Sequence, residues 1–291
     1  MGQKSFALGV ASATGVIFIW SGFIVFSRMG VATPLTPFDI SALRFLVAGA
    51  LTAPFIYAWW PRHLDWRVIA LMVLCGPGSI YTLIMYFGLA DAPAAYAGVF
   101  ANGSLPIFTI ALAAVLGGDW PGPRRLIAIA VIIVGGALVA LPGLRAGGPN
   151  LITGISLFIS ASAILSLYIW GIGRWSITPR QALAIVNLPN VLIFLPVWWL
   201  ALPTGMAEAS WFDILFQAAF QGIGPGFFAV ILFTTATLHL GATATAGFSA
   251  AVPTGAALLA IPVLGETLSA LEWGGVALVS AGLILLVIRR V

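Results

Sequence analysis

The chain has 291 residues, of which 61% are hydrophobic and only 7% charged, and its formal net charge is +4. A soluble domain is about 25% charged, so this composition excludes a water-soluble fold and indicates an integral membrane protein. The apolar runs are close to the roughly 20 residues that a helix needs to cross a bilayer, and they lack the alternation of barrel strands. The basic residues flank these runs, where they set orientation, so they do not indicate nucleic-acid binding.

Hydropathy along the chain predicts ten transmembrane helices joined by short loops, which makes the fold class an all-α, multi-pass membrane protein. The predicted spans are residues 5–27, 37–59, 67–89, 93–117, 124–142, 150–172, 179–201, 211–236, 242–264 and 269–288. The loops are too short to hold a soluble domain.

The positions of the basic residues predict that both termini are cytoplasmic. With the N-terminus inside, the outer loops hold only Arg28 and Arg145, and Arg44 lies within a span. The remaining basic residues then fall on the cytoplasmic side, at Lys4, Arg62, Arg67, Arg124, Arg125, Arg174, Arg180, Arg289 and Arg290. Two cytoplasmic termini require an even number of spans, as ten provides.

One unit occurs twice along the chain. The copies share a Gly-Pro-Gly, a central proline, an acid and a late glycine, at Gly76-Pro77-Gly78 and Gly224-Pro225-Gly226, Pro106 and Pro253, Asp119 and Glu266, and Gly135 and Gly282. A constant offset of about half the chain indicates a duplication. Five spans in each half, residues 1–147 and 148–291, would invert the second half in the membrane and place a cavity between the halves. The alternative is a duplicated bundle with no transport role.

Few ionisable residues fall within the predicted spans. Arg44 lies about two helical turns inside the predicted outer surface, where it could bind a substrate carboxylate or gate a cavity. The alternative is an arginine that snorkels outward or pairs with Asp39. His239 ends the eighth span, and it is interpreted as an interfacial residue, with a proton relay as the alternative.

No Asp or Glu stands in the middle of a predicted span. This argues against a proton-coupled antiporter that works through a buried acid, and against an intramembrane aspartyl protease, which needs two acids. The sequence also has no metal-ligand cluster and no Walker motif. We therefore predict a protein that is not an enzyme and has no catalytic residues, metal or cofactor.

Mid-span aromatic, amide and hydroxyl side chains predict a cavity wall that is polar but largely uncharged. Such a wall suits a neutral or zwitterionic solute with an apolar side chain. The predicted substrate-binding residues are Trp20, Arg44, Tyr81, Met85, Tyr96, Asn102, Trp170 and Ser249. For each residue the alternative is a lipid-facing or packed-core position.

The end of the second half resembles the closing signature of the EamA-type drug/metabolite transporters. It runs through Val263-Leu264-Gly265-Glu266-Thr267-Leu268-Ser269, Trp273-Gly274-Gly275 and Gly282-Leu283. The first half repeats it as Leu116-Gly117-Gly118-Asp119 with Gly135-Gly136. Arg44-Phe45, in a predicted second helix that starts at a proline, also matches the family. The resemblance covers essentially the whole chain, which is most similar to the YddG-type aromatic amino acid exporters of bacterial inner membranes.

The resemblance implies two inverted five-helix repeats, residues 1–147 and 148–291, around a central cavity. We therefore predict a secondary transporter of the bacterial inner membrane that exports amino acids, aromatic ones included, or related metabolites by alternating access. Its partners would be the small-molecule substrate and the lipid bilayer; a monomer is compatible with the sequence, which leaves the oligomeric state open. The alternatives are an exporter of other metabolites or drugs and a non-transporting membrane sensor or assembly component.

Overall fold

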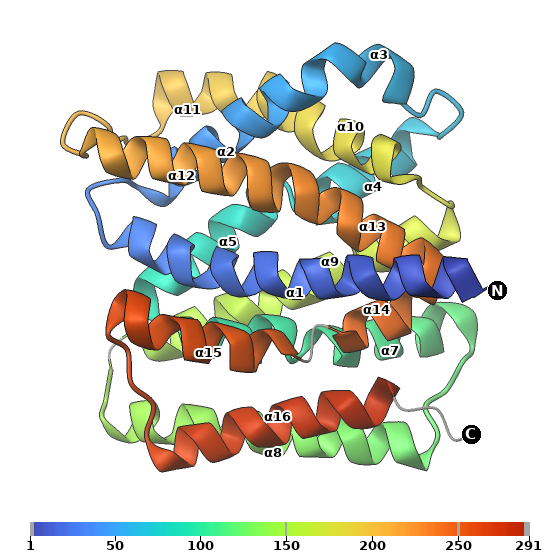
Figure 1. Ribbon diagram of the computed structural model, residues 1–291, viewed down its shortest axis with the longest axis vertical. Helices are drawn as coiled ribbons and strands as arrows, with labels where there is room; N and C mark the ends of the chain where they lie inside the picture. Colours follow the sequence, from blue (N-terminus) through green and yellow to red (C-terminus); the bar gives the residue numbers. More distant parts are fainter. Residues whose placement is uncertain (1–2, 149, 249–250, 288–291) are drawn as a thin grey trace.

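The protein is a bundle of helices that run along a common direction, as the computed structural model shows for residues 3–148, 150–248 and 251–287 (Figure 1). Within those ranges every regular element is a helix. Both chain termini lie at one end of the bundle, which we call the terminal end (Figure 1). The other end, called the opposite end, carries the loops 32–36, 92–93, 202–210 and 265–269 and the described residues 146–148.

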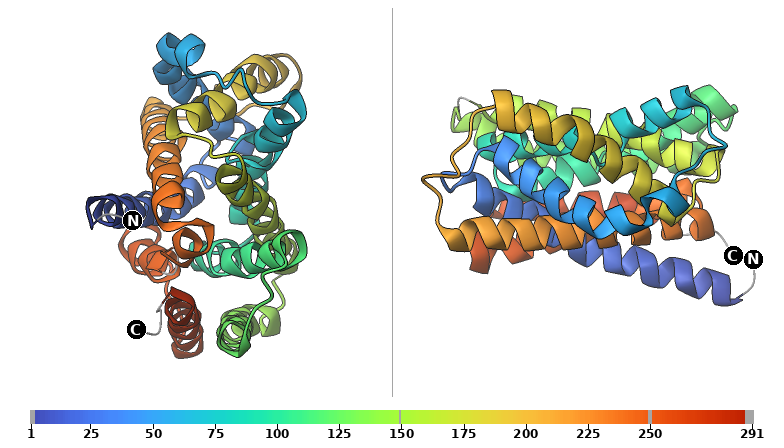
Figure 2. Two further views of the ribbon diagram at one scale, coloured as in Figure 1. Left: turned by 90° about the vertical axis from the view of Figure 1, so that its right-hand side faces the viewer. Right: turned by 90° about the horizontal axis from the view of Figure 1, so that it is seen from above.

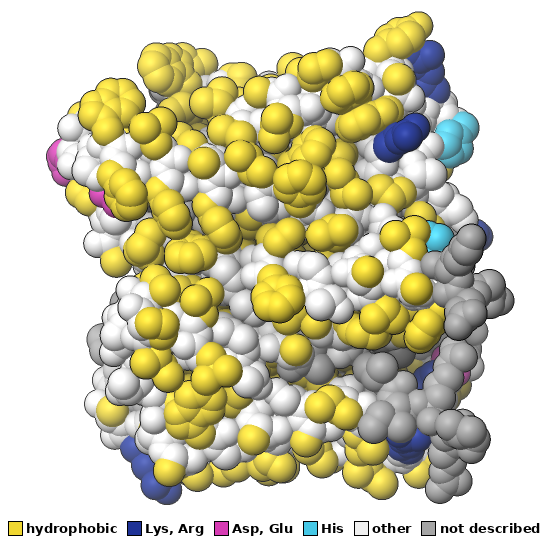
Figure 3. Space-filling view, in the orientation of Figure 1, with side chains coloured by type: hydrophobic (Ala, Val, Ile, Leu, Met, Phe, Trp, Pro, Cys, Tyr) yellow, Lys and Arg dark blue, Asp and Glu magenta, His cyan; other side chains and the backbone are white. Residues whose placement is uncertain are grey.

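Eight helical segments of the described chain are long and apolar enough to cross a membrane, which makes this a multi-pass membrane protein. They are Ser5–Val31, Pro37–Trp59, Trp66–Asp91, Ala94–Gly117, Pro123–Arg145, Leu151–Arg174, Pro179–Ala201 and Trp211–Leu240. Apolar side chains cover much of the visible face, and charged side chains gather towards the two ends (Figure 3). That distribution matches a hydrocarbon layer bounded by water on both sides.

Four helices run without interruption, namely α1 (Gln3–Val31), α8 (Pro123–Arg145), α9 (Leu151–Arg174) and α16 (Ala270–Val287). The other segments are divided. They comprise α2 (Pro37–Thr52), η1 (Ala53–Phe55) and α3 (Ile56–Trp59); α4 (Trp66–Cys75) and α5 (Ser79–Asp91); α6 (Ala94–Ala97), η2 (Gly98–Asn102) and α7 (Leu105–Gly117); α10 (Pro179–Pro189), η3 (Asn190–Phe194) and α11 (Leu195–Ala201); and α12 (Trp211–Ile223), η4 (Gly224–Phe228) and α13 (Ala229–Leu240). The helices α14 (Ala242–Phe248) and α15 (Ala251–Leu264) lie on either side of residues 249–250, which are outside the described residues.

The two Gly-Pro-Gly motifs interrupt their helices in different ways. Residues 76–78 separate α4 from α5, and Gly76 is extended at φ −73° and ψ 176°. Residues 224–226 instead begin η4, a π-helical stretch between α12 and α13. Proline has no N–H to donate, so neither motif can continue a regular α-helical ladder through its centre.

The second helix of each half begins with the same local device. Thr36 caps α2 and Thr178 caps α10, each followed by a proline in the first turn. In both, the threonine side chain accepts from the backbone N–H three residues on, where Asp39 or Gln181 reaches back to the threonine N–H. This reciprocal capping box, with proline preset for the first turn, fixes where each helix starts.

The pair α8 and α16 forms one edge of the bundle, with the two helices in contact along it (Figure 1; Figure 2, left). Glycines let their backbones approach closely. A Cβ atom on Gly135 would lie 2.8 Å from the Gly275 carbonyl oxygen, and one on Gly275 would lie 2.6 Å from the Gly135 oxygen. Further along, a Cβ on Gly282 would lie 3.0 Å from the Ala128 oxygen.

The all-helical membrane fold that the sequence predicts is confirmed for the described residues. The first eight predicted spans coincide with the eight segments above, within a few residues at their ends. The last two predicted spans fall on shorter apolar helices, Ala251–Leu264 with α14 before it, and Ala270–Leu286. Ten spans and two inverted halves therefore stay predictions.

Candidate functional site

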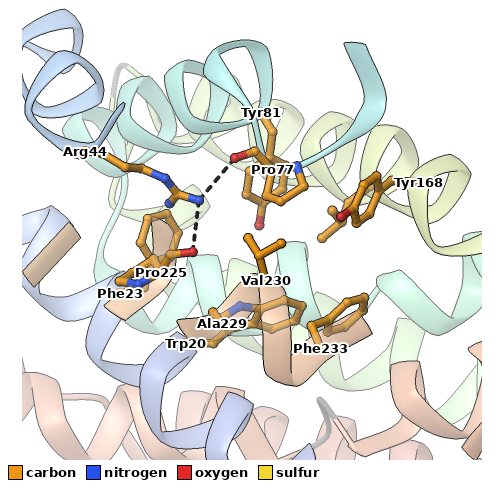
Figure 4. Close-up of a pocket in the computed structure, with 11 residues that line it drawn as sticks. Trp20, Phe23, Arg44, Pro77, Tyr81, Tyr168, Pro225, Ala229, Val230 and Phe233 are labelled. Carbon is orange, nitrogen blue, oxygen red and sulfur yellow. Dashed lines mark hydrogen bonds between the residues drawn. The ribbon is translucent and has the colours of Figure 1, made fainter. Parts of the chain in front are cut away.

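A buried cavity lies where the two helix breaks approach α1, α2, α9 and α13 (Figure 4). It is lined by Trp20, Phe23, Arg44, Pro77, Tyr81, Leu165, Tyr168, Pro225, Ala229, Val230 and Phe233. The space that the centre of a water molecule could occupy there is about 30 Å³. A water needs about 10–15 Å³ by this measure, so this conformation is closed around the site and an amino acid would require the helices to move.

Arg44 of α2 is the only charged side chain among the lining residues, and only 2% of its surface is exposed. Its Nη2 donates to the Pro77 carbonyl oxygen at 3.1 Å and to the Pro225 carbonyl oxygen at 3.3 Å (Figure 4). Its guanidinium carbon lies 5.7 Å from the centre of the Phe23 ring and 5.8 Å from that of Phe45. Its Nε is buried and has no hydrogen-bond partner among the described residues. The guanidinium thus keeps donor capacity.

The two prolines that accept from Arg44 belong to the repeated Gly-Pro-Gly motifs. Pro77 lies between α4 and α5, outside both helices, so its carbonyl is not committed to a helical ladder. Pro225 lies in η4, where the wider π-helical turn loosens regular pairing. The motifs, 148 residues apart in the sequence, therefore meet at one side chain.

Arg44 takes part in neither of the ion pairs found among the described residues, which are Arg28–Glu266 and Arg125–Asp119. Asp39, which could have paired with it, is occupied elsewhere. One Asp39 oxygen accepts from the Gly205 N–H at 2.8 Å, and the other accepts from Trp198 Nε1 at 2.9 Å. Burying a cation without an opposite charge costs free energy, because the low-dielectric interior stabilises the charge less than water does. The arrangement is suited to receiving an anion.

Half of the other residues that line the cavity are aromatic. Trp20 and Phe233 stack with ring centres 5.0 Å apart, and Phe23 lies 5.8 Å from Tyr86. Tyr168 contributes a buried hydroxyl for which the described residues offer no hydrogen-bond partner. A ligand with an apolar or aromatic side chain would find flat apolar faces and a free polar group there.

Three of the predicted binding residues, Trp20, Arg44 and Tyr81, line this cavity. They come from α1, α2 and α5, so tertiary packing gathers residues that are far apart in sequence. The sequence-based set omitted eight further lining residues: Phe23, Pro77, Leu165, Tyr168, Pro225, Ala229, Val230 and Phe233. The repeated Gly-Pro-Gly was the signal that could have identified two of them.

Among the described residues, the other predicted positions do not line the cavity. Met85 is fully buried in the core, and Asn102 lies in η2, also buried. The Tyr96 hydroxyl donates to Glu272 Oε1 at 3.1 Å, and Trp170 packs edge-on against Trp175 with ring centres 5.3 Å apart. Ser249 lies outside the described residues.

Close to Arg44, a chain of buried polar side chains links α1, α5 and α12. Tyr86 donates to Gln221 Oε1 at 3.3 Å, and Gln221 Nε2 donates to Ser27 Oγ at 3.0 Å and to Gln217 Oε1 at 3.0 Å. Gln217 Nε2 in turn donates to the Phe26 carbonyl oxygen at 2.8 Å. These groups satisfy one another, which explains how two amides are tolerated at this depth.

The opposite end of the bundle is closed by an ion pair. Arg28 Nε lies 3.1 Å from Glu266 Oε1, and Arg28 Nη1 donates to the carbonyl oxygens of Leu89 and Ala90. The second Glu266 oxygen accepts from the Ala94 N–H, 2.9 Å away, at the start of α6. These contacts join α1, α5, α6 and the loop before α16, so they must change if this end opens.

Comparison with known proteins gives likenesses of three kinds. Residues 7–141 match the model of the EamA-like transporter family. The uncharacterized transporter YwfM of Bacillus subtilis (strain 168) is 26% identical over 271 residues, which cover 86% of this chain and 84% of YwfM. A solved crystal structure of another protein superimposes with a TM-score of 0.67 at 20% identity, over 98% of this chain and 96% of that one. The last likeness concerns the fold alone.

Proposed function

We propose that this protein is an EamA-like secondary transporter that exports amino acids, aromatic ones included, or related small metabolites. The family match of residues 7–141 and the similarity to YwfM indicate a transporter, which is not an enzyme. Among the described residues no three His, Cys, Asp or Glu side chains gather where they could hold a metal ion. The substrate follows from the chemistry of the cavity.

Arg44 is the observation that carries the proposal. Its guanidinium is buried, faces the cavity, lacks a carboxylate partner and keeps an unpaired Nε. A carboxylate would supply the missing charge and could bind in the two-point manner that arginine favours. Beside it, Trp20, Phe23 and Phe233 offer aromatic faces for the substrate side chain. A small carboxylate with an apolar side chain complements both features.

The proposed mechanism is alternating access between two inverted halves, residues 1–147 and 148–291. It is supported by the constant offset of the duplicated motifs and by the matched caps at Thr36 and Thr178. The cavity is too small for an amino acid in this conformation, so loading and release need helix movement. The breaks at residues 76–78 and 224–228 supply points where helices can bend.

We propose that transport follows the substrate gradient without a proton partner. The cavity lining contains no Asp, Glu or His that could carry a proton through the closed site. His239, the nearest candidate from the sequence, instead hydrogen-bonds through Nδ1 to Ser5 Oγ at 2.8 Å, near the terminal end. A transporter of the bacterial inner membrane with both termini in the cytoplasm fits the distribution of basic residues.

The test is flux in proteoliposomes of the purified full-length protein. Labelled phenylalanine, threonine and a cationic dye would be compared with and without an imposed pH gradient. We expect saturable phenylalanine flux that does not depend on the pH gradient. Flux of the dye alone would favour a drug exporter, flux that requires the gradient would contradict uncoupled transport, and no flux of any solute would favour a sensor or assembly component.

A further inference from the structure

We infer that the carbonyl oxygens of Pro77 and Pro225 form a subsite for the α-ammonium group of the substrate. In this inference Arg44 gives up one of these carbonyls when it binds the substrate carboxylate. The inference rests on the proposed function, because it assumes that a carboxylate binds at Arg44. It narrows the substrates from small carboxylates in general to zwitterionic α-amino acids.

The geometry of the guanidinium supports this subsite. Both carbonyl oxygens lie within hydrogen-bond distance of one nitrogen, Nη2, at 3.1 and 3.3 Å, so they are close to each other. One two-point grip on a carboxylate uses Nε and the neighbouring Nη2, whose N–H bonds lie along the same edge of the guanidinium. Nε has no hydrogen-bond partner among the described residues, but Nη2 already donates to both proline carbonyls. A carboxylate bound on this edge must therefore displace one carbonyl.

The displaced proline oxygen can accept a hydrogen bond from the substrate ammonium. A carbonyl freed in a closed, low-dielectric site needs a new donor, since an unsatisfied buried acceptor is costly. In an α-amino acid the ammonium is attached to the carbon that also bears the carboxylate, so it reaches the same neighbourhood. It has three N–H donors and needs several acceptors. The two proline oxygens already accept from a cation in this structure.

The cavity offers the ammonium no anionic partner. The lining residues include no carboxylate, so the alternatives to the proline carbonyls are the aromatic faces of Trp20, Phe23 and Phe233 and the neutral hydroxyl groups of Tyr81 and Tyr168. A cation–π contact with an aromatic face stabilises an ammonium less than several hydrogen bonds from that ammonium to carbonyl oxygens. Carbonyls at interrupted helices are also the groups that membrane transporters use around bound cations at mid-membrane.

The inference also connects binding to movement. Pro77 belongs to the break in the first half and Pro225 to the break in the second, and Arg44 now holds both. A bound amino acid would replace one of the direct hydrogen bonds from Arg44. Its carboxylate would bind Arg44 and its ammonium would bind the proline carbonyls. A substrate that lacks either group could not complete the link between the two breaks.

The experiment compares three ligands as competitors for labelled phenylalanine in proteoliposomes of the full-length protein: unlabelled phenylalanine, 3-phenylpropionate and phenethylamine. We expect each analogue to require a concentration about tenfold or more higher than phenylalanine for the same inhibition, since each analogue lacks the hydrogen bonds of one charged group. Equal competition by 3-phenylpropionate would overturn the ammonium subsite while leaving the proposed function intact. If phenylalanine itself neither binds nor is transported, both proposals fail.

A pair of variants then identifies the groups involved. Pro225→Ala restores a backbone N–H at position 225, so a regular α-helix can form through η4. The carbonyl oxygen at position 225 would then accept a hydrogen bond within the helix and no longer face Arg44. We expect the preference for phenylalanine over 3-phenylpropionate to fall several-fold. Pro142→Ala is the matched control, since Pro142 lies inside α8 and does not line the cavity. An unchanged preference in Pro225→Ala would overturn the inference; if that variant does not fold, the comparison of ligands decides it.

Discussion

At the residue scale, Arg44 combines a charge, a fork of donors and complete burial, and the three features are separable by substitution. Arg44→Gln removes the charge, and Arg44→Lys keeps the charge but cannot grip a carboxylate at two points. We expect Arg44→Gln to lower the rate of phenylalanine uptake by about tenfold or more. We expect Arg44→Lys to lower this rate as well, but by a smaller factor. The measurement is initial uptake in proteoliposomes at equal protein content.

The matched control for Arg44 is Arg145→Gln, which removes an exposed arginine at the end of α8. This variant is expected to transport like the unmodified protein. Uptake by Arg44→Gln at the rate of the control would remove the carboxylate site from the mechanism.

Asp39 is the second residue whose burial makes a sharp prediction. It is completely buried, and its oxygens accept from Thr36, Trp198 and Gly205, which ties the 202–210 loop to the start of α2. Asp39→Asn replaces an acceptor oxygen by a donor, so at least one of these N–H groups loses its partner. We expect the free energy of unfolding to fall by about 1–3 kcal/mol.

Thermal unfolding of the purified protein in detergent would measure this effect. Asp119→Asn serves as the control, because the Asp119 side chain is 64% exposed and its pair with Arg125 contributes little. A melting midpoint for Asp39→Asn equal to that of the control would contradict the structural role of this carboxylate.

At the element scale, the contact between α8 and α16 depends on the lack of a side chain at Gly275. An added Cβ would lie 2.6 Å from the Gly135 carbonyl oxygen, which belongs to the backbone and cannot rotate away. Gly275→Ala is therefore expected to push the helices apart and to lower stability by about 1–3 kcal/mol, although alanine is the better helix former. Gly274→Ala is the control, because a Cβ there meets nothing within 4 Å.

Thermal unfolding again distinguishes the two glycines. The Gly274 variant should melt at or slightly above the temperature of the unmodified protein, and the Gly275 variant several degrees below it. Equal midpoints for the neighbouring substitutions would mean that the helices adjust at little cost and that their close approach is not required.

At the scale of the whole molecule, both termini lie at one end and the 202–210 loop at the other (Figure 1). With the termini in the cytoplasm, Glu208→Cys should react in intact cells with a membrane-impermeant maleimide, and Arg62→Cys should react only after the membrane is opened. Both positions are exposed, and the single native cysteine, Cys75, is buried, which lowers the background. The reverse pattern of labelling would invert the proposed orientation.

The parts of this molecule that could be predicted from sequence are those that local chemistry determines. Apolar runs located the first eight membrane segments, because a helix must be apolar along a bilayer-sized length. Arg44 attracted notice because a charge within a span is rare. Tyr96 and Met85 had the right residue type and depth, but the packing of all the helices decides which way each one faces. The proline carbonyls at Arg44 could not be predicted from side-chain chemistry, since every residue has a carbonyl.

The hydrogen bonds from Arg44 to two backbone carbonyls bear on how fast the protein can work. The two backbone carbonyls already solvate the Arg44 guanidinium. When a substrate binds, the guanidinium therefore exchanges one set of hydrogen-bond acceptors for another. Such an exchange gains little free energy overall, and the bound state is correspondingly shallow. A transporter must release its substrate as readily as it binds it. Release is easy when Arg44 can form its hydrogen bonds to the two backbone carbonyls again as the substrate leaves.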